Sequence, residues 1–268
     1  MAQAKKKDDQ QNIVDMFGED AGMGGEDVQA QDMLIPFVSI LQKLSPQLNK
    51  RKDEYIEGAE EGMILETSSG RLFEGEKTGI KVVPIKYVRR YTEWVPRDKG
   101  GGLVGERDES VLDACIQQEK GGYKTASGND LVVSGNFYAL IVQEGDAKPI
   151  KAIISMSGSQ LRKARGWVSN LQDQTIKVSD GSVKDAPYYS NVYHLTTVPQ
   201  TNDQGDWFGW KIEREGSTLE VLPAMALHLR DLSRSFYADV KSGRAIAAPQ
   251  TEAAQIGGPA EVDDDIPF

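Results

Sequence analysis

The pattern of apolar and polar positions along the chain predicts a β-rich body between two polar ends. Runs in which β-branched and aromatic residues dominate are typical of strands. Pro84 lies inside the first long run and predicts an edge position or a bulge, because proline donates no ladder hydrogen bond. The long runs occupy residues 80–95, 131–143, 150–156, 188–198 and 207–213, and shorter ones occupy 63–65 and 71–73.

Three other segments place apolar residues three or four positions apart, which is the spacing of a helix buried on one side. They are residues 33–44, a stretch that begins after Ser157 or Ser159 and runs to about 171, and about 223–241. Ser157 or Ser159 is expected to cap the second helix, and Gly243 to end the third. Trp167 on the second helix is expected to pack inward.

The elements follow one another as strand, long loop, strand, strand, helix, strand, loop and strand. An oligonucleotide-binding (OB) barrel has this order, with a helix between its third and fourth strands. We therefore predict a mostly β (α+β) fold, namely an OB-like five-stranded barrel with added N-terminal and C-terminal helices. Ligands of such barrels lie on strands 2 and 3 and on the 1–2 and 4–5 loops, which here are residues 96–130 and 199–206.

The net charge of −10 is unusual for a DNA-binding protein, so its distribution matters. Residues 80–240 contain 20 Lys and Arg against 20 Asp and Glu, whereas residues 1–32 contain three lysines against eight acids. Residues 245–268 contain five acids and no Lys or Arg. Because phosphate binding depends on local charge, a neutral body is compatible with a basic groove. We predict disordered acidic tails at 1–32 and 244–268 around a domain at 33–243.

Several kinds of chemistry have no motif in this chain. Cys115 is the sole cysteine, so an internal disulfide is excluded. His194 and His228 have no partner at metal-ligand spacing. Neither a phosphate-binding Gly-x-x-x-x-Gly-Lys loop nor a Gly-x-Ser-x-Gly elbow occurs. We expect no metal, no cofactor and no enzymatic activity. Without an apolar membrane span or signal peptide, we expect a cytoplasmic protein.

The C-terminal end carries the most specific signal. A terminal aromatic ring fits a pocket, its free carboxylate suits an arginine, and neighbouring acids speed encounter with a basic rim. The end resembles the C-terminal tip of bacterial single-stranded DNA-binding proteins, which docks on replication and repair enzymes. That resemblance implies the same kind of protein partners here. The residues concerned are Asp263, Asp264, Asp265, Ile266, Pro267 and Phe268.

A second, looser resemblance covers Leu34–Phe37, Leu44–Pro46 and Tyr91–Asp98, which look like a phage-encoded class of single-stranded DNA-binding proteins. It implies a non-catalytic protein of DNA replication, recombination and repair, located in the host cytoplasm if phage-encoded. The alternatives are a single-strand annealing or recombination protein and a nuclease that carries a docking tail. The oligomeric state stays open, a homodimer included.

Single strands are held by aromatic faces together with a positive track along the backbone. In the strand at 80–95, Tyr87, Arg89 and Tyr91 share one side and Arg90 and Trp94 the other, and we favour the first side for DNA. The candidate DNA-binding residues are Tyr87, Arg89, Arg90, Tyr91, Trp94 and Arg97 in and after this strand, Lys99, Arg107 and Lys124 in the following loop, and Trp207, Trp210 and Lys211.

Overall fold

The computed structural model of the protein describes residues 18–20, 23–118, 122–142, 148–202 and 205–249. The chain divides into two compact units, Met1–Met33 and Leu34–Phe268. In the first unit, the 3-10 helix η1 (Ala30–Asp32) is capped where the Asp32 carboxylate accepts a hydrogen bond from the Gln29 backbone N–H at 2.8 Å. Most of the two predicted acidic tails, including 1–17 and 250–268, lies outside the described residues.

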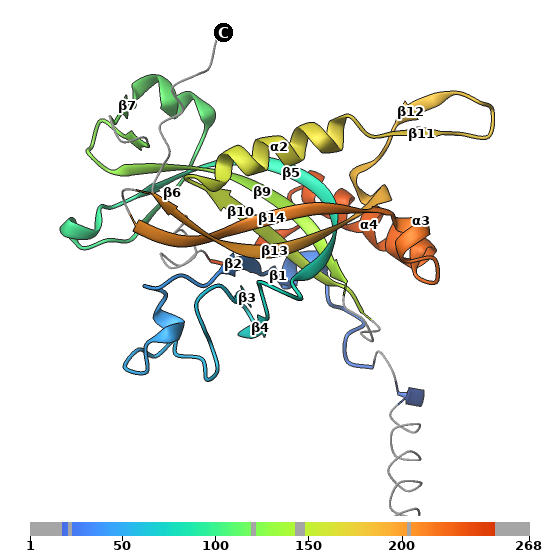
Figure 1. Ribbon diagram of the computed structural model, residues 1–268, viewed down its shortest axis with the longest axis horizontal. Coiled ribbons are helices and arrows are strands. Elements are labelled where there is room, and N and C mark those ends of the chain that lie inside the picture. Colours follow the sequence, from blue (N-terminus) through green and yellow to red (C-terminus); the bar gives the residue numbers. More distant parts are fainter. Residues whose placement is uncertain (1–17, 21–22, 119–121, 143–147, 203–204, 250–268) are drawn as a thin grey trace, which may run out of the picture. The chain divides into compact units, whose positions relative to one another are not determined.

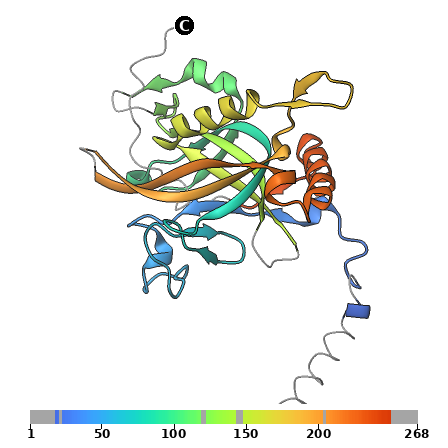
Figure 2. The ribbon, with the colours of Figure 1, turned by 45° about the vertical axis from the view of Figure 1, so that its right-hand side comes forward.

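The second unit is mostly β. Within the described residues its main sheet has eleven strands, which curl into a half-barrel (Figures 1 and 2). They are β2 (Phe37–Ile40), β3 (Ile64–Glu66), β4 (Arg71–Phe73), β5 (Ile80–Trp94), β6 (Leu103–Arg107), β7 (Ile116–Gln117), β8 (Tyr123–Lys124), β9 (Asp130–Val142), β10 (Ile150–Ser157), β13 (Asn191–Asn202) and β14 (Gly205–Ser217).

Two small strand pairs and several helices complete this unit. The strand pairs are β1 (Leu34–Ile35) with β15 (Ile246–Ala247), which is parallel, and β11 (Thr175–Lys177) with β12 (Val183–Asp185), which is antiparallel. The helices are α2 (Gln160–Gln172), α3 (Thr218–Val221) and α4 (Ala226–Lys241). The 3-10 helices are η2 (Pro46–Leu48), η3 (Arg97–Lys99), η4 (Glu109–Ala114) and η5 (Tyr188–Ser190).

The main sheet runs in the order β14-β13-β5-β9-β10-β2-β3-β4, while β6 pairs with β5, and β8 pairs with β7 and β9. The five long strands that the sequence predicts are present as β5, β9, β10, β13 and β14, and α2 lies between β10 and β13 along the chain. The number of strands in the predicted five-stranded barrel was wrong. The loop at 96–130 contributes strands of its own, and the segment at 33–44 is extended.

The predicted helix at 33–44 was wrong, since β1 and β2 occupy this segment. Ile35, Phe37 and Val38 are all buried, although alternate strand positions face opposite sides. A strand covered on both faces gives a short apolar run that periodicity does not distinguish from a buried helix. β2 is also bonded along both edges, parallel to β10 and antiparallel to β3.

β5 is an inner strand of the sheet, between β13 and β9. The register of its pairing with β9 shifts between Pro84 and Lys86. Of the two positions that Pro84 predicted, the bulge is therefore confirmed, and the edge position is wrong.

Two helices cover the two faces of the central strands. α2 packs on the face that carries Phe137, and the Phe137 and Trp167 rings stack with centroids 4.1 Å apart. The inward packing expected of Trp167 is confirmed. α4 packs on the opposite face, where Tyr138 meets Phe236 edge to face at 6.1 Å.

The ends of the helices follow the sequence signals in part. Ser159 stands at the N-cap of α2 but makes no side-chain capping bond. Gly243, at φ 75°, follows α4 and ends it as predicted. The chain then returns along β1, where the Ala248 N–H donates to the Ile35 carbonyl at 2.8 Å, so the ordered body extends past Gly243. Of the helices in the described residues, none has the length and apolar content to cross a membrane.

Candidate nucleic-acid interface

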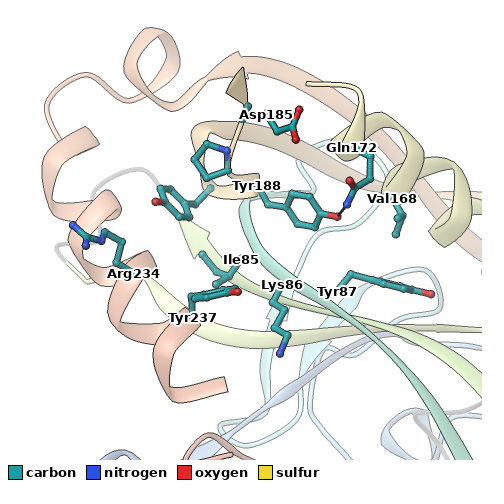
Figure 3. Close-up of a pocket in the computed structure, with 12 residues that line it drawn as sticks. Ile85, Lys86, Tyr87, Val168, Gln172, Asp185, Tyr188, Arg234 and Tyr237 are labelled. Atoms are coloured by element: carbon teal, nitrogen blue, oxygen red, sulfur yellow. Dashed lines mark hydrogen bonds between the residues drawn. The ribbon is translucent and has the colours of Figure 1, made fainter. Parts of the chain in front are cut away.

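A pocket of about 900 Å³ opens between β5, α2, η5 and α4, and we call it the tyrosine pocket. Figure 3 shows Tyr87 from β5 and Tyr188 from η5 facing the same space, with Tyr237 and Arg234 coming from α4. Tyr189 also lines it. Four aromatic rings from three elements that are distant in sequence therefore surround one opening.

The four rings keep exposed surface. Tyr237 is exposed, with 40% of its full accessibility, and the other three tyrosines are half-buried. Hydrogen bonds hold η5 in place: the Gln172 amide donates to the Tyr188 hydroxyl, and the Thr218 hydroxyl donates to the Tyr189 backbone carbonyl at 2.8 Å. A fixed ring that is partly exposed offers a stacking surface without a large ordering cost.

The Tyr87 ring lies close to the backbone of β9 because residue 135 is a glycine. A Cβ atom at Gly135 would lie 2.9 Å from the Tyr87 ring and 3.0 Å from the Ala164 methyl group of α2. The Tyr87 ring also meets the Phe137 ring at a centroid distance of 5.0 Å. The floor of the pocket is thus a close contact of strand, ring and helix.

The tyrosine pocket is lined by two cations and one acid, namely Lys86, Arg234 and Asp185. Burial raises the pKa of the Tyr87 hydroxyl, and the positive charges of Arg89 and Arg165 act in the opposite direction. Both arginines therefore lie close enough to affect this ring. Aromatic faces beside a surplus of positive charge suit bases and phosphates.

The structure buries most of the aromatic residues that we expected to contact DNA. Tyr91, Trp94, Trp207 and Trp210 retain 4%, 6%, 6% and 2% of their accessibility. The Tyr91 hydroxyl donates to Glu109 at 3.0 Å, and Trp207 Nε1 donates to the Gln200 side chain at 3.0 Å. A ring covered to this extent offers no free face to a base. Of the five aromatic residues expected to contact DNA, only Tyr87 lies at the candidate interface.

Three of the expected cations are bound to acids of a neighbouring strand. Arg90 pairs with Glu106 and donates to the Tyr138 hydroxyl at 3.1 Å. Arg107 Nε donates to Glu93 at 2.6 Å, and Lys124 pairs with Asp130 at 2.5 Å. These pairs join β6 and β8 to the long strands β5 and β9. Their charge is partly balanced before any phosphate arrives.

Glu93 is the centre of the polar contacts at this end of β5. Its carboxylate retains 6% exposure and accepts hydrogen bonds from the Asn129 amide at 2.7 Å and from the Thr125 and Ser127 hydroxyls at 3.2 Å. The Asn129 bond, with further bonds from Arg107 and Ser127, lowers the pKa of Glu93 despite burial. This network holds residues 123–130 against the sheet.

The remaining expected cations are exposed, and one of them, Lys211, pairs with Glu213 of the same strand at 2.9 Å. Arg89 lies over the Tyr91 ring at 5.6 Å, and Arg97 and Lys99 lie on η3 after β5. Lys211 and the buried Trp210 line a second, smaller pocket of about 430 Å³ between α2 and β14. The expected residues therefore divide between several places and do not form one continuous surface.

Sequence reasoning missed Tyr188, Tyr189, Tyr237 and Arg234. Tyr188 and Tyr189 were read as the start of a strand, whereas they form η5 after Pro187. Tyr237 is on the predicted C-terminal helix, next to the buried Phe236. The one signal in the sequence that could have revealed the site was Tyr237, an aromatic residue outside the apolar face of the predicted helix.

Two other predictions bear on the site. Asp263–Phe268, the expected partner-binding end, lies outside the described residues. Across the part of the chain that the structure describes, no group of three or more His, Cys, Asp or Glu residues is placed to hold a metal ion.

No curated protein and no solved structure matches this chain significantly. One family model does match, and it covers residues 4–245, which is most of the sequence. The match spans the body that carries the tyrosine pocket. The chain belongs to the Pam3 phage gp34-like protein family.

Proposed function

We propose that this protein is a non-catalytic single-stranded DNA-binding protein that acts in phage DNA replication, recombination and repair. The observation that carries the proposal is the tyrosine pocket, in which four partly exposed rings lie beside Lys86 and Arg234. Stacking on aromatic rings tolerates any base, because every base has a π face. The cations supply attraction for the phosphates that join those bases.

The magnitudes are sufficient for useful affinity. A stacked base contributes about 1–3 kcal/mol, so two bases in the pocket would contribute about 2–6 kcal/mol before the cations act. The phosphate contacts add a term that weakens as salt rises. Arg89 and Arg165, which lie close to Tyr87, would extend the positive track beyond the pocket.

We propose that the body is an OB-like barrel with additions. The order β10-β9-β5-β13-β14, with α2 between β10 and β13, supports this interpretation. β2 stands where such a barrel would close. There the Gln42 amide donates to the Phe208 carbonyl at 2.8 Å and accepts from the Phe208 N–H at 2.9 Å, joining the end of β2 to β14.

We also propose that Asp263–Phe268 recruits replication and repair proteins, a role that rests on the sequence of this end alone. The test uses a purified host enzyme that binds the tip of the host's own single-stranded DNA-binding protein. The full chain should bind this enzyme, and a chain without Phe268 should not. Equal binding by both chains would remove the proposal.

The DNA-binding proposal is tested by titrating a fluorescent oligo-dT at 50 and 200 mM NaCl, with duplex DNA of the same length as the control. We expect tight binding to the single strand, weak binding to the duplex, and loss of affinity at the higher salt. Absence of single-strand binding at 50 mM NaCl would refute the proposal. Pairing of labelled complementary strands would instead indicate an annealing protein, and cleavage in magnesium a nuclease.

A further inference from the structure

The second pocket lies on the other side of α2 from the tyrosine pocket. Val168 and Gln172 of α2 line the tyrosine pocket, whereas Lys163, Gly166 and Asn170 of the same helix line the second one. The opposite wall of the second pocket is formed by β13 and β14. We call it the α2–β14 pocket.

Gly166 is an unexpected residue at this place. It lies in the middle of α2 and is exposed, and a Cβ atom added to it would meet no atom within 4 Å. Glycine inside a helix is less favourable than alanine because it loses more backbone freedom on folding. The packing of the protein by itself therefore gives no reason for glycine at this position.

Positive charge is held around the same pocket. The Lys163 ammonium donates to the Trp210 carbonyl at 2.6 Å, which fixes it between α2 and β14. Arg214 Nε donates to the Asn191 side chain at 2.8 Å, and Lys211 lies 2.9 Å from Glu213. Three lining cations face two nearby acids, Glu213 and Glu220, and this surplus of positive charge favours an anion.

The floor of the α2–β14 pocket holds two covered polar groups. Trp167 and Tyr193 line it with 3% and 2% exposure, and neither Trp167 Nε1 nor the Tyr193 hydroxyl makes a hydrogen bond of normal geometry with a described residue. Burial raises the pKa of Tyr193, while Arg214 and the nearby Trp167 N–H oppose that rise. Because the Trp167 N–H lies beside the Tyr193 hydroxyl, the O–H of Tyr193 is the donor that remains for a ligand that accepts hydrogen bonds.

We propose that the α2–β14 pocket binds a phosphate group of the single strand, and that residue 166 is a glycine so that this phosphate can approach the helix backbone. The inference rests on the proposed function. A strand with bases in the tyrosine pocket and a phosphate in the α2–β14 pocket crosses the outer side of α2. Two exposed cations, Arg162 and Arg165, belong to this helix.

The test compares the wild type, Gly166→Ala and a matched control, Ser169→Ala, in the full chain. Ser169 is exposed on the same helix and does not line the pocket. Gly166→Ala should raise the melting temperature by about 2–4 °C, because alanine favours the helix. It should also weaken oligo-dT binding about fivefold to tenfold at 50 mM NaCl and lower the salt slope by about 0.7, the value for one phosphate. Ser169→Ala should leave binding unchanged.

A gain in stability with a loss of affinity separates a ligand contact from damage to the fold. If the wild type binds oligo-dT and Gly166→Ala binds it equally well with the same salt slope, the phosphate site is refuted and the proposed function stands. If the wild type does not bind oligo-dT at 50 mM NaCl, the proposed function is refuted, and the phosphate site with it. Equal weakening by Ser169→Ala would also refute the site.

Discussion

Replacement of Tyr237 by alanine tests the tyrosine pocket most directly. The ring lines the pocket from α4, and the residue is 40% exposed, so the substitution removes a stacking surface with limited damage to the core. A stacked base contributes about 1–3 kcal/mol, so oligo-dT affinity should fall about 5-fold to 150-fold. Because the side chain is about half buried, stability should fall by only about 1–2 kcal/mol, or about 2–8 °C in melting temperature.

The assay is a fluorescence anisotropy titration of oligo-dT at several salt concentrations, run well below the melting temperature of each variant. Tyr237→Phe keeps the ring and should retain most of the affinity. Leu227→Ala changes a residue of α4 that is 78% exposed and does not line the pocket, so its binding should equal that of the wild type. Arg234→Gln should reduce the salt slope by about 0.7, whereas Tyr237→Ala should leave it unchanged.

These contrasts make the reasoning refutable. A folded Tyr237→Ala protein with wild-type affinity would mean that no base rests on this ring. A reduced salt slope in Tyr237→Ala would mean that the substitution acts through phosphate contacts instead. Equal weakening by Leu227→Ala would point to a change in α4 as a whole.

Three further predictions concern stability and the C-terminal end. Glu93→Gln should cost about 1.5–3 kcal/mol at pH 7, measured by urea unfolding, because hydrogen bonds to a buried charge are lost. The pKa of Glu93 is lowered in the folded state. Its contribution to the free energy of unfolding is therefore present above the unfolded pKa and is lost as pH falls through the folded pKa. A stability difference between wild type and Glu93→Gln that does not narrow in acid would contradict this. Gln42→Ala should cost about 1–3 kcal/mol in the same assay, since two hydrogen bonds to Phe208 disappear, and a change below 0.5 kcal/mol would argue against a closing role. Removal of residues 261–268 should strengthen oligo-dT binding at 50 mM NaCl, because an acidic segment competes with phosphates; unchanged or weaker affinity would count against such competition.

Much of the sheet was predictable because its strands have strong local signals. The long run at 80–95 is rich in β-branched and aromatic residues, and it forms β5 with the bulge that Pro84 suggested. The helix around Trp167 was equally clear from its spacing. The segment at 33–44 was not, because burial on both faces removes the alternation that distinguishes a strand.

The candidate site was far less predictable than the fold. A local search favours aromatic and basic residues that are adjacent in sequence, such as those from Tyr87 to Arg97. Burial then decides which of them are available, and it depends on distant elements: Trp94 is covered while Tyr87 is not. The tyrosine pocket joins residues about 50 to 150 positions apart, so only tertiary structure brings Tyr87, Tyr188 and Tyr237 together.

The close packing of the Tyr87 ring on Gly135 has a consequence for how this pocket changes during evolution. Gly135 does not line the pocket, yet a Cβ atom there would lie 2.9 Å from the Tyr87 ring. A larger residue at position 135 would displace this ring and change the shape of the pocket. Selection on the shape of the pocket would therefore act on a small residue of β9 that a bound strand need not touch.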